Sequence, residues 1–172
     1  ICMKMFKLIS LLSALVFFIG CDSKDDKGIA VASQQQASGT QSTISLAKLP
    51  FQGAGNIDGI NAEPVKAQGQ TFTIKGDFVK VQGWAVDNVN NDLAKNVYVN
   101  IAGKDYEASY GIPRSDVGDF LKDSRLNNCG FSVSVPTKDI SAKDAQIFIK
   151  IVSSKGDGYF EYPLKINVSI AK

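Results

Sequence analysis

Three aromatic side chains have the chemistry to contact a sugar: Trp84, Tyr106 and Tyr110. Trp84 is the single tryptophan of the 172-residue chain, and it follows Gly83 directly. Sugars stack their C–H faces on exposed aromatic rings, so a solvent-facing Trp84 beside Tyr106 or Tyr110 would form a glycan-binding platform. The alternative, which we favour, is a tryptophan packed between two sheets of the core.

Arg114 and Asp116 form a second candidate site, at the start of a predicted short helix. A guanidinium can hold an anionic ligand through two parallel hydrogen bonds. The two side chains can also pair with each other, or Asp116 can cap the helix while Arg114 binds a carbonyl or carboxylate elsewhere. We favour the interpretation in which Arg114 holds the loop in place.

The loop from Asp87 to Asp92 supplies oxygen atoms of the kind that Ca²⁺ prefers. It lacks the glycine and the terminal glutamate of an EF-hand loop, and Asn and Asp are also common turn residues. Asp87 and Asp92 are therefore weak calcium candidates. The sequence predicts no resident metal and no cofactor.

The composition excludes catalysis that depends on histidine. The chain contains no histidine, which excludes Ser-His-Asp and Cys-His mechanisms. The carboxyl groups available for a two-carboxylate glycosidase mechanism are those of Asp87, Glu107, Asp116, Asp119 and Asp123. Nothing in their spacing requires such a pair. We therefore expect a protein that is not an enzyme, with a small glycan-active enzyme that uses a carboxylate pair as the alternative.

The elements that must position these residues are short strands. From about Asn56 onward, apolar and polar residues alternate, which is typical of half-buried strands. The run from Phe160 to Ile170 is the clearest case, although Pro163 within it indicates an edge or a bulge. Ser115 to Asp123 is the one predicted helix. About seven short strands with regular turn signals predict an all-β, antiparallel two-sheet sandwich.

Four short runs occur in order in this region: Gly55–Asp58, Val81–Asp87, Tyr110–Val117 and Gly130–Phe131. Together they resemble an immunoglobulin-like β-sandwich module of bacterial envelope proteins, some of which carry it beside membrane-embedded glycosyl- or acyltransferase domains. The resemblance implies an Ig-like sandwich over residues 56–172. It implies an accessory role and not a transferase reaction, because fold alone carries no activity.

The N-terminal residues predict export and lipid anchoring. Lys4 and Lys7 precede the apolar run Leu8–Ile19, which is too short to span a bilayer comfortably and fits a signal peptide. The run Phe18-Ile19-Gly20-Cys21 resembles the lipobox of bacterial lipoproteins, in which the cysteine is acylated and becomes the mature N-terminus. This resemblance implies a signal peptide over residues 1–20 and a membrane anchor on Cys21.

Residues 21–55 predict a flexible tether, since they are rich in Ser, Gln, Ala and Gly. The less polar stretch from Ile44 to Phe51 leaves open a short docking segment. Asp22 resembles the signal for inner-membrane retention in enterobacteria-like lipoproteins. We expect a protein of the bacterial cell envelope that faces the periplasm, with the choice of inner or outer membrane open.

Charge and cysteine content complete the prediction. The formal net charge is +2, and removal of Lys4 and Lys7 with the leader leaves equal numbers of basic and acidic side chains. The mature chain therefore lacks the basic surface that nucleic-acid binding needs. Cys129 follows Cys2 and Cys21, and no histidine can activate it. The sequence predicts a lipid-anchored sandwich that binds an envelope protein or a glycan, or a scaffold that only fills periplasmic space.

Overall fold

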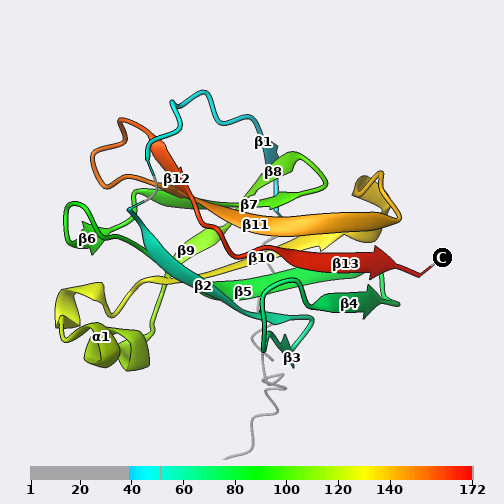
Figure 1. Ribbon diagram of the computed structural model, residues 1–172, viewed down its shortest axis with the longest axis horizontal. Helices are drawn as coiled ribbons and strands as arrows, with labels where there is room; N and C mark the ends of the chain where they lie inside the picture. The colour runs from blue at the N-terminus through cyan, green and yellow to red at the C-terminus, as the bar shows by residue number, and fades with distance from the viewer. Residues whose placement is uncertain (1–38, 51, 172) are drawn as a thin grey trace, which may run out of the picture. The chain divides into compact units, whose positions relative to one another are not determined.

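The computed structural model describes residues 39–50 and 52–171. Within these residues, thirteen strands form two sheets, and one α-helix and two 3₁₀-helices lie in the connections (Figure 1). The predicted all-β, sandwich-like fold with a short helix is confirmed. The predicted signal peptide, Cys21 and most of the predicted tether lie outside the described residues. No helix in the described part of the chain is long and apolar enough to cross a membrane.

The first sheet has six strands, and all of its pairs are antiparallel. In spatial order they are β3 (Glu63–Pro64), β2 (Ala54–Ile60), β5 (Phe78–Asp87), β10 (Gly130–Pro136) and β9 (Ser109–Ile112), with β6 (Asp92–Leu93) paired to β5. Along β5, the buried residues Val79 and Val81 alternate with Lys80 and the exposed Gln82. The strand therefore has one face toward the core and one face outside.

The second sheet has seven strands. In spatial order they are β1 (Gln41–Ser42), β8 (Lys104–Glu107), β7 (Asn96–Ile101), β11 (Asp144–Val152), β13 (Ile166–Ile170) and β4 (Thr71–Ile74), with β12 (Tyr159–Glu161) paired to β11. The strands β4 and β13 are parallel, which departs from the expected antiparallel arrangement. They lie far apart in the sequence, so no hairpin turn imposes an antiparallel direction on them.

The apolar run from Phe160 to Ile170 forms two strands instead of one. β12 ends at Glu161 and β13 begins at Ile166, with Pro163 between them. Proline lacks the N–H that a continuous strand would donate to β11. The two halves nevertheless both pair with β11, at different positions along it.

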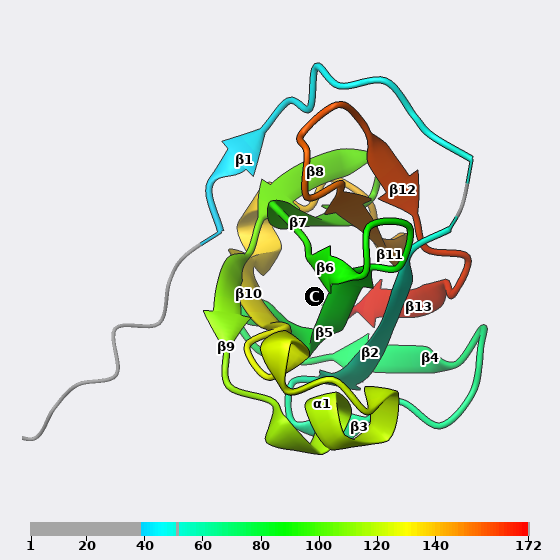
Figure 2. The same cartoon turned by 90° about the vertical axis from the view of Figure 1, so that its left-hand side faces the viewer.

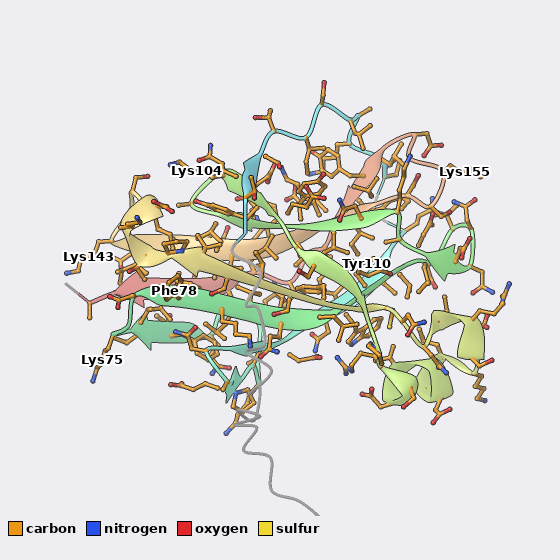
Figure 3. All side chains as sticks on the ribbon, turned by 180° about the vertical axis from the view of Figure 1, so that it is seen from behind. Lys75, Phe78, Lys104, Tyr110, Lys143 and Lys155 are labelled. Carbon is orange, nitrogen blue, oxygen red and sulfur yellow. The ribbon has the colours of Figure 1, made fainter. Side chains whose placement is uncertain are left out.

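The main core lies between the two sheets. It consists of alternate residues of the long strands, and those with no exposed surface include Ile57, Val79, Val81, Val97, Val99, Val135, Ile147, Ile149, Ile151 and Ile166. Side chains fill the space between the sheets, while Lys75, Lys104, Lys143 and Lys155 project from the periphery (Figure 3). Burial of this large aliphatic surface is the main force that holds the sheets together.

Residues 39–49 belong to the folded unit, although their composition predicts a tether. β1 pairs with β8 at one edge of the second sheet. At the other edge, the Leu49 amide donates to the Tyr159 carbonyl at 2.8 Å, and the Tyr159 amide donates to the Ala47 carbonyl at 3.0 Å. We call residues 39–49 the strap. Between its two ends the strap passes over the outer side of β7, β8 and β12 (Figures 1 and 2).

The folded unit therefore begins before the predicted boundary at residue 56. Leu49, within the stretch that the sequence left open as a docking segment, packs against the main core. A Cβ atom on Gly158 would overlap Leu49, and a Cβ atom on Gly39 would overlap Val133. Glycine at both positions allows the strap to lie close to the sandwich.

The helix α1 (Ser115–Leu121) and the 3₁₀-helix that follows it (Ser124–Leu126) cover the outer face of the first sheet near β5 (Figure 2). They enclose a second core of Val86, Val117, Leu126 and Cys129. The N-cap residue of α1 is Arg114, which makes no side-chain cap hydrogen bond, and Asp116 lies inside the helix. Phe120 of α1 does not pack against this core and is 76% exposed.

Candidate functional site

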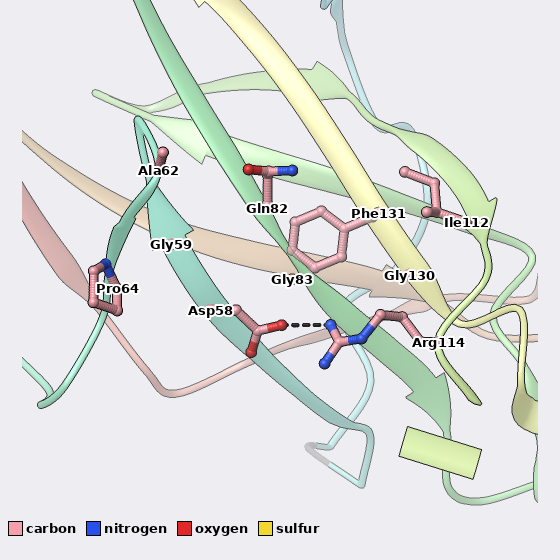
Figure 4. A pocket seen from close by; sticks show the side chains of 10 residues that line it. All are labelled: Asp58, Gly59, Ala62, Pro64, Gln82, Gly83, Ile112, Arg114, Gly130 and Phe131. Carbon is pink, nitrogen blue, oxygen red and sulfur yellow. Dashed lines mark hydrogen bonds and ion pairs between the residues drawn. The ribbon is translucent and has the colours of Figure 1, made fainter. Parts of the chain in front are cut away.

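A hollow of ≈ 330 Å³ lies on the outer face of the first sheet, beside α1. Side chains and backbone from five strands and from the segment before α1 line it (Figure 4). The lining residues are Asp58, Gly59, Ala62, Pro64, Gln82, Gly83, Ile112, Arg114, Gly130 and Phe131. Three of them are glycines of the neighbouring strands β2, β5 and β10.

Glycine is required at two of these positions because the backbone or a side chain lies against it. A Cβ atom on Gly130 would lie 2.7 Å from the Ile112 carbonyl oxygen and 2.9 Å from Cγ of Arg114. A Cβ atom on Gly83 would overlap the Asn56 carbonyl oxygen and lie 2.8 Å from the Phe131 ring. Gly130 thus lets the stem of Arg114 lie on the sheet, and Gly83 lets β2 and Phe131 approach β5.

Arg114 is held between two carboxylates. Its Nη1 donates to Asp58 Oδ2 at 2.5 Å, the pair drawn in Figure 4. Its Nε and Nη2 donate to the two carboxylate oxygens of Asp116, each at 2.8 Å. The hydrogen bond from Arg114 lowers the pKa of Asp116, and the bond to Asp116 raises the pKa of Arg114. The two predicted residues therefore form an ion pair, and Asp116 takes the bidentate position that an anionic ligand would need.

The hollow retains unused hydrogen-bonding capacity. The side chains of Arg114 and Asp58 remain 26% and 36% exposed. A guanidinium has five N–H groups, of which Arg114 uses three among the described residues. Gln82 is exposed and its carboxamide has no partner in the described part of the chain. Donors and acceptors therefore meet in one place, next to the aliphatic side chains of Ile112 and Pro64.

Trp84 lies neither in a solvent-facing platform nor between the sheets. It is half-buried and packs against the second core, on the side of β5 that faces away from the main core. The favoured interpretation, burial between the sheets, is therefore wrong. The reason is the phase of the β5 alternation, which directs Val81 and Ala85 into the main core and Trp84 to the opposite face.

Tyr106 and Tyr110 belong to the main core or pack against it, and neither lines the hollow. Tyr106 is 2% exposed in the main core. The Tyr110 hydroxyl donates to the Ala85 carbonyl at 2.7 Å and accepts from the Ala94 amide at 3.1 Å. Burial raises the pKa of both phenols. The hydroxyls and rings of both tyrosines therefore serve the fold, and contact of either one with a ligand stays a prediction.

The Asp87–Asp92 loop uses its first carboxylate internally. Asp87 is fully buried and accepts hydrogen bonds from the backbones of Val89, Asn90 and Ser154 and from the side chains of Asn90 and Ser154. Burial alone would raise the pKa of Asp87, but these donors outweigh it and lower the pKa. Asp92 is exposed and accepts from the Leu93 amide. Among residues 39–50 and 52–171, no group of three or more His, Cys, Asp or Glu side chains could hold a metal ion.

The remaining candidates for chemistry also serve the fold. Cys129 has no exposed surface and lies in the second core, where burial raises the pKa of its thiol. Asp123 pairs with Arg125, whose hydrogen bonds lower the pKa of the Asp123 carboxyl. Glu107 accepts from the Asn96 side chain at 2.6 Å. None of these three groups lines the hollow.

Sequence reasoning missed Asp58 and Gln82 as site residues, although a signal was present. Asp58 belongs to the run Gly55–Asp58 and Gln82 to the run Val81–Asp87. All four runs on which the Ig-like resemblance rests contribute residues to the hollow. The four runs, which are separate in sequence, therefore meet at one surface.

Comparison with known proteins adds no family to this description. No protein-family model matches the chain, and a search of curated proteins gives no significant match.

Proposed function

We propose that this chain is a bacterial envelope lipoprotein, acylated at Cys21, whose sandwich binds a protein or a glycan partner without catalysis. The observation that carries the binding part is the hollow at Arg114, which residues from four separate runs line on an accessible face. Three of these runs supply unused donors and acceptors, on Asp58, Gln82 and Arg114. The lipobox-like run Phe18–Cys21 and the preceding apolar segment support the anchor.

The proposal includes a location in the cell envelope and an Ig-like identity for the sandwich. An exported, acylated Cys21 would hold the domain on a membrane surface facing the periplasm, and Asp22 favours the inner membrane. The Ig-like identity of the sandwich is supported by the two-sheet architecture and by the order of the four runs. The domain would then present its hollow to other components of the envelope.

Binding is better supported than hydrolysis by a carboxylate pair. Asp58 and Asp116 both contact Arg114, so they are the obvious pair for the alternative. A glycosidase needs one carboxyl group with a raised pKa that donates a proton. Arg114 does the opposite to Asp116, since its hydrogen bond lowers the pKa of that carboxyl. The pair is therefore suited to holding Arg114 and a ligand in place.

Site-specific photo-cross-linking in cells tests the binding proposal. Ile112, which is 39% exposed at the rim of the hollow, is replaced by the photoreactive amino acid p-benzoylphenylalanine. Phe78 is exposed on the same sheet but does not line the hollow, and it receives the same replacement as a matched control. We expect a light-dependent adduct from position 112 that position 78 does not give. Absence of an adduct at 112, or the same adducts from both positions, would contradict the proposal.

A further inference from the structure

We infer that the hollow at Arg114 binds a neutral polyhydroxylated ligand, namely a sugar ring of a glycan. This inference rests on the proposed binding function and selects one of its two partner classes. Three observations carry it: the charge balance of the hollow, its mixture of fixed donors and acceptors, and its aliphatic rim.

The charge balance disfavours an anionic ligand. Arg114 is the one cation among the lining residues, and it is bonded to the carboxylates of Asp58 and Asp116. The three groups together carry one net negative charge, since Arg114 keeps Asp116 ionised. A phosphate or carboxylate would be repelled by this negative charge. In addition, Nε and Nη2 of Arg114, which could bind such an anion through two parallel hydrogen bonds, already donate to Asp116. A cationic group would lie against the guanidinium, so a neutral ligand fits best.

The mixture of donors and acceptors matches hydroxyl groups. A hydroxyl group both donates and accepts hydrogen bonds. Neighbouring hydroxyls on a sugar ring can therefore bind a guanidinium, which only donates, a carboxylate, which only accepts, and a carboxamide, which does both. Arg114 offers two unused N–H groups, Asp58 offers free lone pairs, and the Gln82 carboxamide offers both kinds.

Two of these groups are fixed before a ligand binds. Asn56 donates to Asp58 Oδ1 at 2.7 Å, and Asp116 holds the other side of Arg114. A ligand would therefore restrict few side-chain rotamers.

The shape of the hollow is consistent with one ring or two. Its volume of ≈ 330 Å³ lies at the low end of the range of about 300–1,000 Å³ found for ligand pockets. Ile112, Pro64 and Ala62 form aliphatic walls against which the C–H faces of a sugar can pack.

Ala62 also has an unusual backbone. It follows Asn61 in the turn between β2 and β3, and both have positive φ values, 49° and 68°. Glycine is the usual second residue of such a turn. Alanine adopts this backbone conformation less readily than glycine, and it places a methyl group on the rim.

Titration followed by NMR tests the ligand class. The probes are chitotetraose, maltotetraose and mannotetraose, with inorganic phosphate as the anionic comparison, added to ¹⁵N-labelled mature chain with Cys21→Ser. We expect at least one tetrasaccharide, at concentrations of about 1–20 mM, to shift the amides of Gly59, Gly83 and Gly130. Phosphate should leave these amides unchanged. No shift with any tetrasaccharide, or a shift with phosphate alone, overturns the inference.

Two glutamine variants localise the binding. Gln82→Ala should weaken binding of the active sugar about 10-fold, the effect of losing one or two hydrogen bonds. Gln146 is also an exposed strand glutamine, on β11 of the other sheet, and Gln146→Ala should leave the affinity unchanged. Equal effects of both variants overturn the assignment of the site. A protein cross-linked from position 112, together with no sugar-induced shift, would overturn the glycan inference and leave the binding proposal standing.

Discussion

At the scale of single residues, Gly83 determines how closely β2 and Phe131 approach β5. The backbone of β2 and the ring of Phe131 occupy the space that a side chain at this position would need. The hollow lies directly over this contact. A change here therefore affects both the stability of the sandwich and the geometry of the site.

Replacement of Gly83 by alanine should destabilise the domain by about 2–4 kcal/mol, because the added methyl group overlaps the Asn56 carbonyl oxygen and the Phe131 ring. Urea unfolding measures the change. Gly76→Ala is the matched control, since a Cβ atom there meets nothing within 4 Å, and it should change stability by less than about 1 kcal/mol. Equal stability of the two variants would contradict the packing described for Gly83.

Asp87→Asn should cost on the order of 3 kcal/mol at pH 7, because the buried carboxylate accepts five hydrogen bonds from donors that an amide group cannot all satisfy. The pKa of Asp87 is lowered in the folded state. The stabilisation that the ionised carboxylate gives the fold is therefore complete above the ordinary carboxyl pKa, and it is lost as the pH falls through the folded-state pKa.

Urea unfolding at pH 7 and at about pH 3 tests this linkage. The difference in stability between wild type and Asp87→Asn should narrow at the lower pH. The exposed Asp92, at the other end of the loop, provides the control, and Asp92→Asn should show a small difference at both pH values. A difference for Asp87→Asn that stays constant or grows on acidification would contradict the account.

Local spacing predicted some contacts of the candidate site and missed others. The pairing of Arg114 with Asp116 is a contact between residues two positions apart, so the sequence alone suggested it. The second partner of Arg114, Asp58, comes from β2, and nothing in local spacing points to it. The alternation around Trp84 predicted a strand with two faces. The alternation could not predict which face of this strand would pack on the other sheet and which face would pack on α1.

At the scale of elements, the strap changes the limits of the folded domain. It bonds through its backbone to β8 at one edge and to β12 at the other, and Lys48 pairs with Glu161 at 2.8 Å. Uncovered sheet edges are sites of unwanted strand pairing. The composition of this stretch predicted a tether. The prediction failed because the strap is held mainly by backbone hydrogen bonds to existing sheets, and such pairing needs few apolar side chains.

A chain that begins at Gln52, before β2, should be less stable than one that begins at Ser38, by on the order of 3 kcal/mol. The shorter chain loses the strap hydrogen bonds and the packing of Leu49, and it exposes the edges of β8 and β12. Urea unfolding measures the difference, and size-exclusion chromatography should detect association of the shorter chain. Equal stability and monodispersity of both chains would show that the strap is dispensable.

Alternation predicted the strands, but not how they assemble. It located the strands because half-buried residues repeat every second position. The break at Pro163 was partly foreseen, since proline donates no hydrogen bond. The parallel pair β4–β13 was not foreseen, because pairing between distant segments depends on the whole sandwich and leaves no local pattern.

At the scale of the whole molecule, the strap would limit how far the sandwich can move from the proposed membrane anchor at Cys21. Residues 22–38 span at most about 60 Å when fully extended, and residues 22–53 about 110 Å. Because the strap is bound to the sandwich, only residues 22–38 separate it from Cys21, and the limit of about 60 Å applies. The proposed protein would thus present its hollow within a defined distance of the bilayer.

Metabolic labelling with an alkyne-tagged fatty acid tests most directly the claim that this sandwich is displayed from a membrane. The chain is produced in a bacterial host as wild type and as Cys21→Ser, with Cys129→Ser as the control for the other cysteine of the mature chain. The account predicts label in the membrane fraction for wild type and Cys129→Ser, and none for Cys21→Ser. Label that persists in Cys21→Ser, or wild-type protein that stays unlabelled in the cytosol, would contradict it.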